Sequence, residues 1–317
     1  MNSRKKIRVG VVGVGYLGKL HAEKYAKIPE AELVGVTDID HARAREIASL
    51  TGTTAYPAYK DFFGHVDAVS VVTPTESHAK VGAEFLSRGI DVLMEKPIAS
   101  NLAEADALIK EADRSKAVLQ VGHLERFNAA FTEARKRITV PSYIEAHRLS
   151  PFPNRSTDVD VILDVMIHDI DLVLSLVDSE VTKVEASGTR VLTDKLDICN
   201  ARLRFKNGCT ANIIGSRAAR EKVRRLNIAQ SGSLISVDFL NQQLFISSVE
   251  PGKPFGRITE EEVKVAKGDS LLEEIKSFLL CSMEKTAPVV SGWDGRAALE
   301  VAGRIQEAVR EGAGLSG

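Results

Sequence analysis

The sequence has few cysteines, little net charge and no long hydrophobic run. Its 317 residues include three cysteines, Cys199, Cys209 and Cys281, which lie far apart and form no C-x-x-C pair. This pattern indicates neither a disulfide framework nor a thiolate metal site, and it favours a reducing cytoplasm. A formal net charge of -1 argues against nucleic acid as a partner.

No segment approaches the roughly 20 continuous apolar residues of a membrane span. The start, MNSRKK followed by an apolar stretch, resembles a secretion signal, but four glycines interrupt it and no small-residue cleavage site follows. We therefore expect an unprocessed cytoplasmic protein that makes no membrane contact. The length exceeds the size at which single cores usually stop growing, so two domains are expected.

Residues 1–122 alternate strands with helices. The predicted strands lie at residues 7–12, 32–37, near 55, 68–72, 91–94 and 118–121, and the predicted helices at 17–28, 41–50, 59–64, 77–88 and 102–114. Strands that alternate with helices imply right-handed parallel crossovers. We therefore predict a dinucleotide-binding Rossmann domain with a doubly wound parallel sheet.

Residues 123–317 have a different pattern, dominated by long strands. These are predicted at 143–149, 181–191, 196–205, 209–217, 223–230, 234–239 and 243–249, with helices at 129–138, 159–177, 271–283 and 295–309. Asn207-Gly208 predicts a type I′ hairpin. We expect an α+β domain with a largely antiparallel sheet flanked by helices, which carries the substrate site. An apolar sheet face would suggest a homo-dimer or homo-tetramer.

The segment GVGYLG lies between the first strand and the first helix. It is a G-x-G-x-x-G turn, whose glycines let backbone N–H groups approach a pyrophosphate. The predicted cofactor-binding residues of this turn are Gly13, Gly15, Tyr16, Leu17 and Gly18. The alternative is a surface loop that merely tolerates glycine.

Asp38 follows the glycine turn at the spacing of about 20 residues at which an acid binds the adenosine ribose. A carboxylate there repels the 2′-phosphate of NADP, so the sequence favours NAD. Arg43 and Arg45 lie close enough in sequence to leave NADP open. Asp38 as a simple helix N-cap is the alternative.

Glu95, Lys96 and Pro97 follow the predicted strand 91–94 directly. The carboxyl ends of strands in a doubly wound sheet are where ligands bind, so Lys96 is expected at the cofactor crevice. Pro97 biases Lys96 toward an extended conformation. A solvated Glu-Lys pair in a loop is the alternative.

The apolar segment 159–177 carries a polar stripe of Asp160, Asp164, His168, Asp171 and Ser175 at spacings of three and four. Such a stripe faces solvent or a cavity. Asp164 and His168 form an i, i+4 pair, in which the carboxylate can raise the basicity of the imidazole for proton transfer. A surface stripe and a divalent-metal site remain alternatives, although no compelling ligand motif is present and we expect no metal.

Over essentially its full length the chain resembles the Gfo/Idh/MocA oxidoreductase family. The motifs are GVGYLG, VVTPTESHA at 71–79, EKP at 95–97, VGHLERFNAA at 121–130 and LDVMIHDIDL at 163–172. The resemblance implies an NAD(P)-dependent dehydrogenase with Lys96, Asp164 and His168 as its catalytic group. It also implies further cofactor contacts: Thr73, Pro74, His78, Glu95 and Lys96.

In such a site a neutral imidazole takes the proton of a secondary alcohol while hydride leaves the same carbon. His168 would be this base, Lys96 would stabilise the charge on the reacting oxygen, and Asp164 would orient the histidine. Two departures concern pocket shape: apolar residues occupy 161–163 and 165–167, where relatives often carry glycines or small residues.

The segment VGHLERFN is similar to that of UDP-N-acetylglucosamine 3-dehydrogenases, which oxidise the sugar 3-hydroxyl ahead of transamination in lipid A assembly. A UDP diphosphate needs cationic donors, for which Arg126, Arg148 and Arg155 fall in suitable segments, and His123 could reach nicotinamide or substrate. Two alternatives remain: a dehydrogenase of a free aldose, inositol or other polyol, and a non-catalytic NAD-binding sensor.

Overall fold

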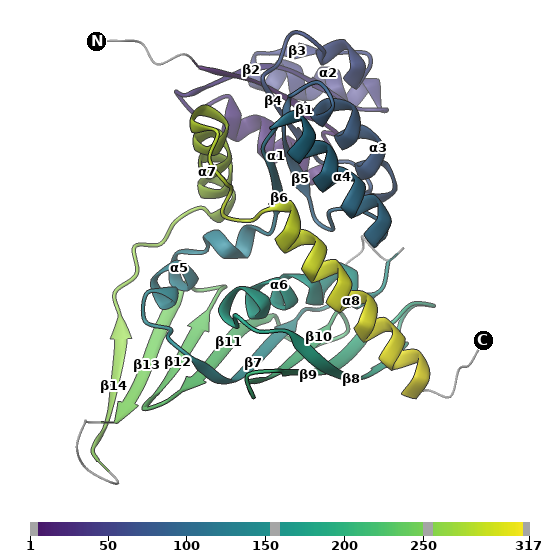
Figure 1. Ribbon diagram of the computed structural model, residues 1–317. Helices are drawn as coiled ribbons and strands as arrows, with labels where there is room; N and C mark the ends of the chain where they lie inside the picture. The colour runs from purple at the N-terminus through teal and green to yellow at the C-terminus, as the bar shows by residue number, and fades with distance from the viewer. Residues whose placement is uncertain (1–5, 153–158, 250–255, 313–317) are drawn as a thin grey trace. The chain divides into compact units, whose positions relative to one another are not determined.

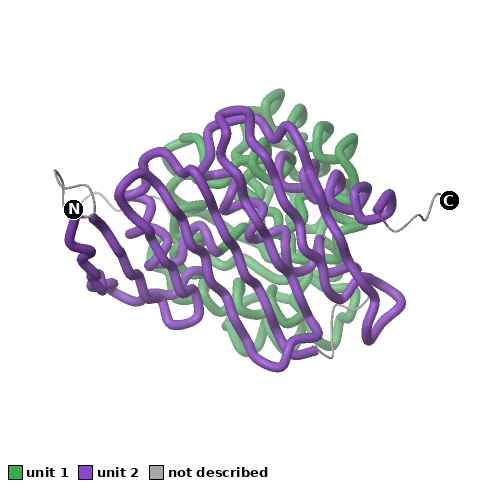
Figure 2. Tube along the Cα trace, turned by 90° about the horizontal axis from the view of Figure 1, so that it is seen from below, with its two compact units in different colours: residues 1–124, 271–296 green, residues 125–270, 297–317 purple. Residues whose placement is uncertain are grey.

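The computed structural model describes residues 6–152, 159–249 and 256–312 (Figure 1). Contacts divide the chain into two compact units, coloured separately in Figure 2. Unit 1 consists of residues 1–124 and 271–296, and unit 2 of residues 125–270 and 297–317. Among the helices described, none has the length and apolar character needed to cross a membrane.

Unit 1 contains a six-stranded parallel sheet in the order β3-β2-β1-β4-β5-β6. Its strands are β1 (Ile7–Val12), β2 (Ala31–Thr37), β3 (Thr54–Ala55), β4 (Ala68–Val71), β5 (Asp91–Glu95) and β6 (Leu119–Gly122). Most of their residues are buried, as expected for strands covered on both faces. The predicted doubly wound sheet is confirmed.

Helices cover both faces of this sheet (Figure 1). They are α1 (Tyr16–Tyr25), α2 (His41–Thr51), α3 (Thr75–Leu86), α4 (Leu102–Ser115) and α7 (Ser270–Glu284), with a short 3₁₀ helix at Tyr59–Phe62. Helices α1, α2 and α7 contribute to one hydrophobic core, while α3 packs against α4. Asp40 and Asn101 cap α2 and α4 through their side chains.

Helix α7 belongs to unit 1 although it follows the whole sheet of unit 2 in the sequence. Leu271, Ile275 and Phe278 are buried in the core of unit 1. Lys285, just after the helix, pairs with the buried Asp91 at the start of β5. The predicted boundary at residue 122 lies close to the point where the chain first passes from unit 1 to unit 2. The chain then returns to unit 1 for residues 271–296, so one boundary does not separate the two units.

Unit 2 is built on an eight-stranded sheet in the order β14-β13-β12-β11-β7-β10-β9-β8. The strands are β7 (Pro141–Leu149), β8 (Val181–Thr189), β9 (Ile198–Phe205), β10 (Thr210–Ser216), β11 (Val223–Gln230), β12 (Ser233–Asp238), β13 (Gln243–Val249) and β14 (Ile258–Val263). Strands β7 and β10 pair in parallel, and the other pairs are antiparallel. The predicted largely antiparallel sheet is confirmed.

The predicted type I′ turn at Asn207-Gly208 is wrong, although a hairpin joins β9 and β10 there. Gly208 has a φ of +89°, whereas Asn207 is not among the described residues with positive φ. The Asn207 side chain instead accepts a hydrogen bond from the Cys209 backbone N–H. A type I′ turn needs positive φ at both central positions, so this loop is a different turn.

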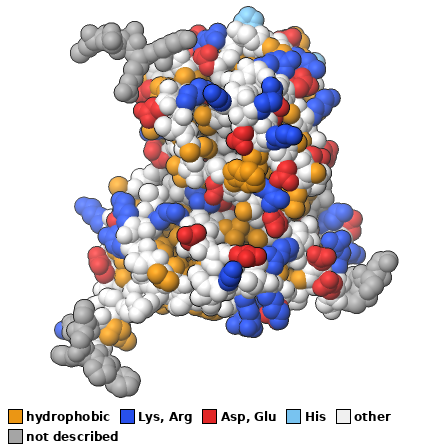
Figure 3. Space-filling model, viewed as in Figure 1, with side chains coloured by type: hydrophobic (Ala, Val, Ile, Leu, Met, Phe, Trp, Pro, Cys, Tyr) orange, Lys and Arg blue, Asp and Glu red, His pale blue; other side chains and the backbone are white. Residues whose placement is uncertain are grey.

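One face of the unit 2 sheet is covered by α5 (Ala129–Arg135), α6 (Ile167–Leu176) and the later part of α8 (Gly292–Gly312), which share a single core with the strands (Figure 1). The opposite face exposes Tyr143, Leu234 and Phe245 among polar and charged side chains such as Arg202 and Arg225. On the side of the molecule seen in Figure 3, which has the view of Figure 1, charges of both signs are interspersed.

Candidate active site

The glycine turn joins β1 to α1 and its geometry requires glycine at two positions. Gly13 has a φ of +84°, and a Cβ at Gly18 would lie 1.9 Å from the Gly13 carbonyl oxygen. At Gly15 a Cβ would meet no atom within 4 Å. Two glycines therefore close the turn, while the third leaves open space where a pyrophosphate can approach backbone N–H groups. These residues fit a dinucleotide.

The two residues between these glycines differ in their surroundings. Tyr16 begins α1 and is 70% exposed. Leu17 is partly buried and packs against the core of unit 1. Their predicted contacts with the cofactor stay predictions.

Asp38 lies just after β2, and its carboxylate is bound to the glycine turn itself. The Val14 N–H donates to Asp38 Oδ2 at 2.8 Å, and the Asp40 N–H donates to Oδ1 at 2.9 Å. Arg43 approaches the same carboxylate at 3.7 Å. Asp38 thus fixes the turn in addition to the ribose-binding role predicted for it, and it is not the N-cap of α2, which is Asp40.

His78 connects the carboxyl ends of β4 and β5. Its ring nitrogens lie 2.8 Å from the carbonyl oxygens of Thr73 and Pro97. Burial lowers the pKa of His78 despite these acceptors. Pro74 is the N-cap residue of α3, so the predicted cofactor-lining residues of this segment gather where β4 passes into α3.

Glu95, the last residue of β5, is held by a buried polar chain that the sequence analysis did not identify. His21 Nε2 lies 3.2 Å from Glu95 Oε1, and His21 Nδ1 lies 3.1 Å from Ser70 Oγ, which in turn contacts Tyr25 at 2.8 Å. The other Glu95 oxygen accepts the Lys96 N–H at 3.2 Å. The position of His21 on the buried side of α1, near the glycine turn, was the available signal.

In unit 2 the predicted helix 159–177 contains a π turn at Ile162–Met166, followed by α6. The Ile167 N–H donates to the Ile162 carbonyl, five residues back. The predicted helix is therefore not a regular α-helix at Asp164, and the pairing of Asp164 with His168 stays a prediction. Single π turns in α-helices are frequent at functional sites.

Three polar residues of this stripe, Asp160, Asp171 and Ser175, make contacts that stabilise the fold. Asp160 accepts the N–H groups of residues 162 and 163, Asp171 pairs with Arg126, and the Ser175 hydroxyl donates to a backbone carbonyl. Asp164 and His168, the two residues implied to be catalytic, are partly exposed. Asp160, Asp171 and Ser175 therefore have structural contacts, and the catalytic roles of Asp164 and His168 stay predictions.

Two of the three arginines predicted to bind substrate, Arg126 and Arg148, have carboxylate partners. Arg126 donates to Asp171 through Nε and Nη2 at 2.6 and 2.8 Å, and Arg148 donates to Asp169 and Glu125. Arg155 lies outside the described residues. His123 is buried directly after β6. Substrate contacts by these residues stay predictions, and the ion pairs give Arg126 and Arg148 a structural role.

The implied catalytic group is divided between the units. Lys96 lies in unit 1, at the carboxyl end of β5, whereas Asp164 and His168 lie in unit 2. The Lys96-Pro97 peptide bond is cis, and Lys96 is partly exposed. The meeting of the three side chains around one reacting carbon stays a prediction.

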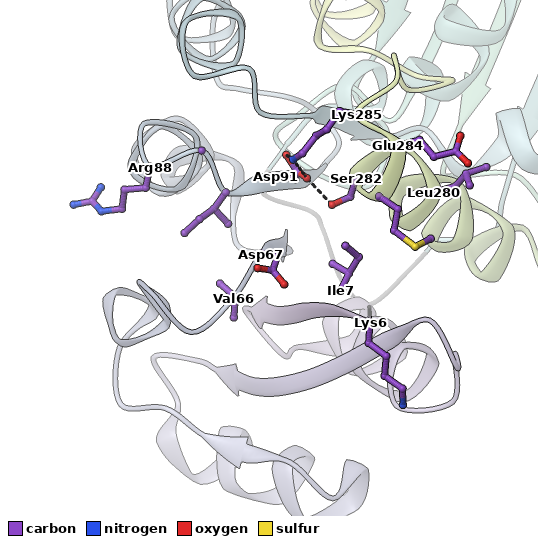
Figure 4. A pocket seen from close by; sticks show the side chains of 13 residues that line it. Lys6, Ile7, Val66, Asp67, Arg88, Asp91, Leu280, Ser282, Glu284 and Lys285 are labelled. Carbon is purple, nitrogen blue, oxygen red and sulfur yellow. Dashed lines mark hydrogen bonds and ion pairs between the residues drawn. The ribbon is translucent and has the colours of Figure 1, made fainter. Parts of the chain in front are cut away.

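Unit 1 also contains a pocket of about 630 Å³, whose lining includes neither Lys96 nor the glycine turn (Figure 4). It is lined by Ile7, Asp67 and Asp91, at or next to the amino ends of their strands, and by residues at the end of α7. Dinucleotides bind at the carboxyl ends of such strands. This pocket is therefore not the cofactor site.

The glycine turn yields a matched pair of predictions. Gly18→Ala is expected to lower the free energy of unfolding by about 2 kcal/mol or more, since its methyl group meets backbone. Gly15→Ala is expected to leave unfolding nearly unchanged but to raise the Kd for NAD about tenfold or more by filling the open space. Urea unfolding without cofactor and NAD titration measure the two effects. Unchanged NAD binding in Gly15→Ala would contradict this role for the turn.

Comparisons with known proteins agree with this geometry. A family model described as "Oxidoreductase family, NAD-binding Rossmann fold" matches residues 7–123, and the "GFO/IDH/MocA C-terminal domain" model matches residues 120–234. The chain is 41% identical to UDP-N-acetylglucosamine 3-dehydrogenase of Acidithiobacillus ferrooxidans, over 96% of this chain and 97% of that protein. It is 28% identical to myo-inositol 2-dehydrogenase of Thermotoga maritima, over 92% and 93% of the two chains.

Solved structures show the same fold. The Acidithiobacillus enzyme superposes with a TM-score of 0.92 at 40% identity, covering 96% of this chain and 98% of that one. A levoglucosan dehydrogenase in complex with NADH and levoglucosan, at 18% identity, shares the fold with a TM-score of 0.88, over 97% of this chain and 98% of that one. The protein belongs to the Gfo/Idh/MocA family of NAD-dependent oxidoreductases.

Proposed function

We propose that this enzyme oxidises the 3-hydroxyl of UDP-N-acetylglucosamine to a ketone. The observation that carries the proposal is the 41% identity, over nearly the full length of both chains, to a relative named for that reaction. The resemblance of the VGHLERFN segment at 121–128 agrees with it. NAD, when bound, accepts the hydride.

In this proposal three side chains act on the substrate carbon that bears the hydroxyl. His168 takes the hydroxyl proton as the C–H bond releases its hydride, so the alcohol becomes a ketone and one proton remains on the enzyme. Lys96 donates a hydrogen bond to the reacting oxygen and stabilises its negative charge. Asp164, on the same helical segment as His168, orients the imidazole.

A second candidate is oxidation of an inositol or another free polyol. It is supported by the 28% identity to a myo-inositol 2-dehydrogenase. The two substrates differ in charge, because a UDP-sugar carries a diphosphate and an inositol carries none. Recognition of the nucleotide sugar requires cations that an inositol site does not need.

The deciding experiment measures NADH formation with UDP-N-acetylglucosamine, free N-acetylglucosamine and myo-inositol. We expect kcat/KM for the UDP-sugar to exceed that for either uncharged compound by about a hundredfold or more, since charged hydrogen bonds are lost with the diphosphate. Reduction of the product with borodeuteride should place the label at carbon 3. Preferential oxidation of inositol would overturn the proposal.

The proposal includes a cytoplasmic location and a homo-oligomer. Three free, buried cysteines are compatible with a reducing compartment. The large apolar side chains on the uncovered side of the unit 2 sheet, such as Tyr143 and Phe245, would support subunit pairing.

A further inference from the structure

Two arginines lie opposite each other on the inner face of the unit 2 sheet. Arg148 on β7 and Arg224 on β11 are register partners. Alternate residues of the two strands, Ala146 and Leu226, belong to the core shared with α6. Because side chains alternate along a strand, both guanidinium groups point to the same side as α6.

The first of these arginines, Arg148, is bound by two carboxylates. Arg148 donates to both oxygens of Asp169 at 2.9 and 2.8 Å and to Glu125 at 2.8 Å, and its side chain is 6% exposed. Burial opposes its charge, but Asp169 and Glu125 outweigh this and raise the pKa of Arg148. Arg148 therefore has its charge neutralised within the fold.

The second arginine, Arg224, is more exposed and contacts only one of these carboxylates among the described contacts. The side chain of Arg224 is 38% exposed, and its Nη1 lies 3.2 Å from Glu125 Oε1, an oxygen that also accepts from Arg148. Burial and the neighbouring Arg148 charge lower the pKa of Arg224. Arginine has five N–H donors in a planar fork, so one shared oxygen leaves most of this donor capacity for an anion.

Arg224 lies near the end of β11, beside the ends of β7 and β10. Leu149, Ser216 and Val223 are register neighbours at the ends of β7, β10 and β11. A Cβ at Gly215 would lie 2.2 Å from Met166, so the π turn that contains Asp164 rests directly on the end of β10. Asp169, the partner of Arg148, is the residue after His168.

We propose that Arg224 binds the diphosphate of the substrate, while Arg148 holds the helix of His168 in place. This rests on the proposed function, because only an anionic substrate needs such a cation. It also replaces the expectation that Arg148 contacts substrate. Arg224 was not predicted as a site residue, although its alternation with Leu226 and Ile228 along the predicted strand 223–230 indicates an inward position.

The test compares Arg224→Gln with Arg225→Gln. Arg225 is exposed on the opposite face of the same strand, so it supplies the same change in charge without the proposed contact. Calorimetric titration with UDP alone measures binding, NAD titration measures the cofactor site, and steady-state kinetics give KM for UDP-N-acetylglucosamine. Arg224→Lys is the conservative variant, and thermal unfolding shows that each protein is folded.

We expect Arg224→Gln to raise the Kd for UDP and the KM for the UDP-sugar roughly tenfold to a hundredfold, with an unchanged Kd for NAD. Arg224→Lys should raise both constants less, and in Arg225→Gln both should stay within about twofold of their values in the natural protein. Equal UDP affinity in the two glutamine variants, with UDP-sugar turnover intact in the natural enzyme, overturns this inference alone. Absence of both UDP binding and UDP-sugar turnover in the natural enzyme overturns the proposed function as well.

Discussion

His168→Asn is expected to lower kcat by about a hundredfold to ten thousandfold, the range that a positioned general base contributes. Asparagine keeps a polar side chain of similar reach but cannot take the hydroxyl proton at neutral pH. The Kd for NAD should change little, because the glycine turn and Asp38 lie in unit 1 and His168 in unit 2. Steady-state kinetics and NAD titration of the same preparation measure both quantities.

The matched control is His147→Asn. His147 lies on β7 next to Arg148 and contacts Glu145 at 3.1 Å, with partial exposure. The same substitution there removes an imidazole from unit 2 without touching the stripe of α6. If His168→Asn retained a kcat close to that of His147→Asn, His168 would not be the base, and the roles proposed for Asp164 and Lys96 would need to be reassigned.

Arg148→Met is expected to lower the free energy of unfolding by about 3–5 kcal/mol, the cost of removing one partner from a buried ion pair. Asp169 and Glu125 are nearly inaccessible to solvent and would lose their shared cation. Arg224 contacts Glu125 but has no ion pair with Asp169 among the described contacts. Urea-induced unfolding measures the loss.

Arg225→Met provides the reference for this measurement, since it removes an exposed arginine from the neighbouring strand. We expect its stability to lie within about 0.5 kcal/mol of the natural protein. Combining Arg148→Met with Asp169→Leu should recover part of the loss, because the stranded carboxylate is then removed. If Arg148→Met had normal stability but a raised KM for the UDP-sugar, the result would instead support the direct contact between Arg148 and substrate that the sequence analysis predicted.

Most helices and strands of both units could be predicted because the pattern of apolar residues in the sequence indicates them. Strands β1, β11 and β13 have the predicted bounds, since their apolar residues end where turn residues begin. Strand β14 was missed because Glu260, Glu261 and Glu262 dominate it. Charged residues have low strand propensity but suit an edge strand, where they oppose pairing with another chain.

The candidate site was predictable in its residue types but less so in its contacts. The motif that contains Asp164 and His168 predicts the helix, yet its residues are compatible with either an α turn or the wider π turn. Similarly, an arginine's partner depends on tertiary structure: Arg148 and Asp169 are 21 residues apart. The amphipathic pattern of residues 271–283 predicts a helix but does not indicate which core it joins.

Because α7 returns to unit 1, the nucleotide-binding unit of this enzyme is not one continuous segment of the chain. A clone ending at residue 124 would omit Phe278 and Leu279 from its interior. It would also leave the buried carboxylate of Asp91 without the ammonium of Lys285 and the hydroxyl of Ser282. Dissection of this protein into separately expressed halves therefore needs the later segment spliced back onto the first.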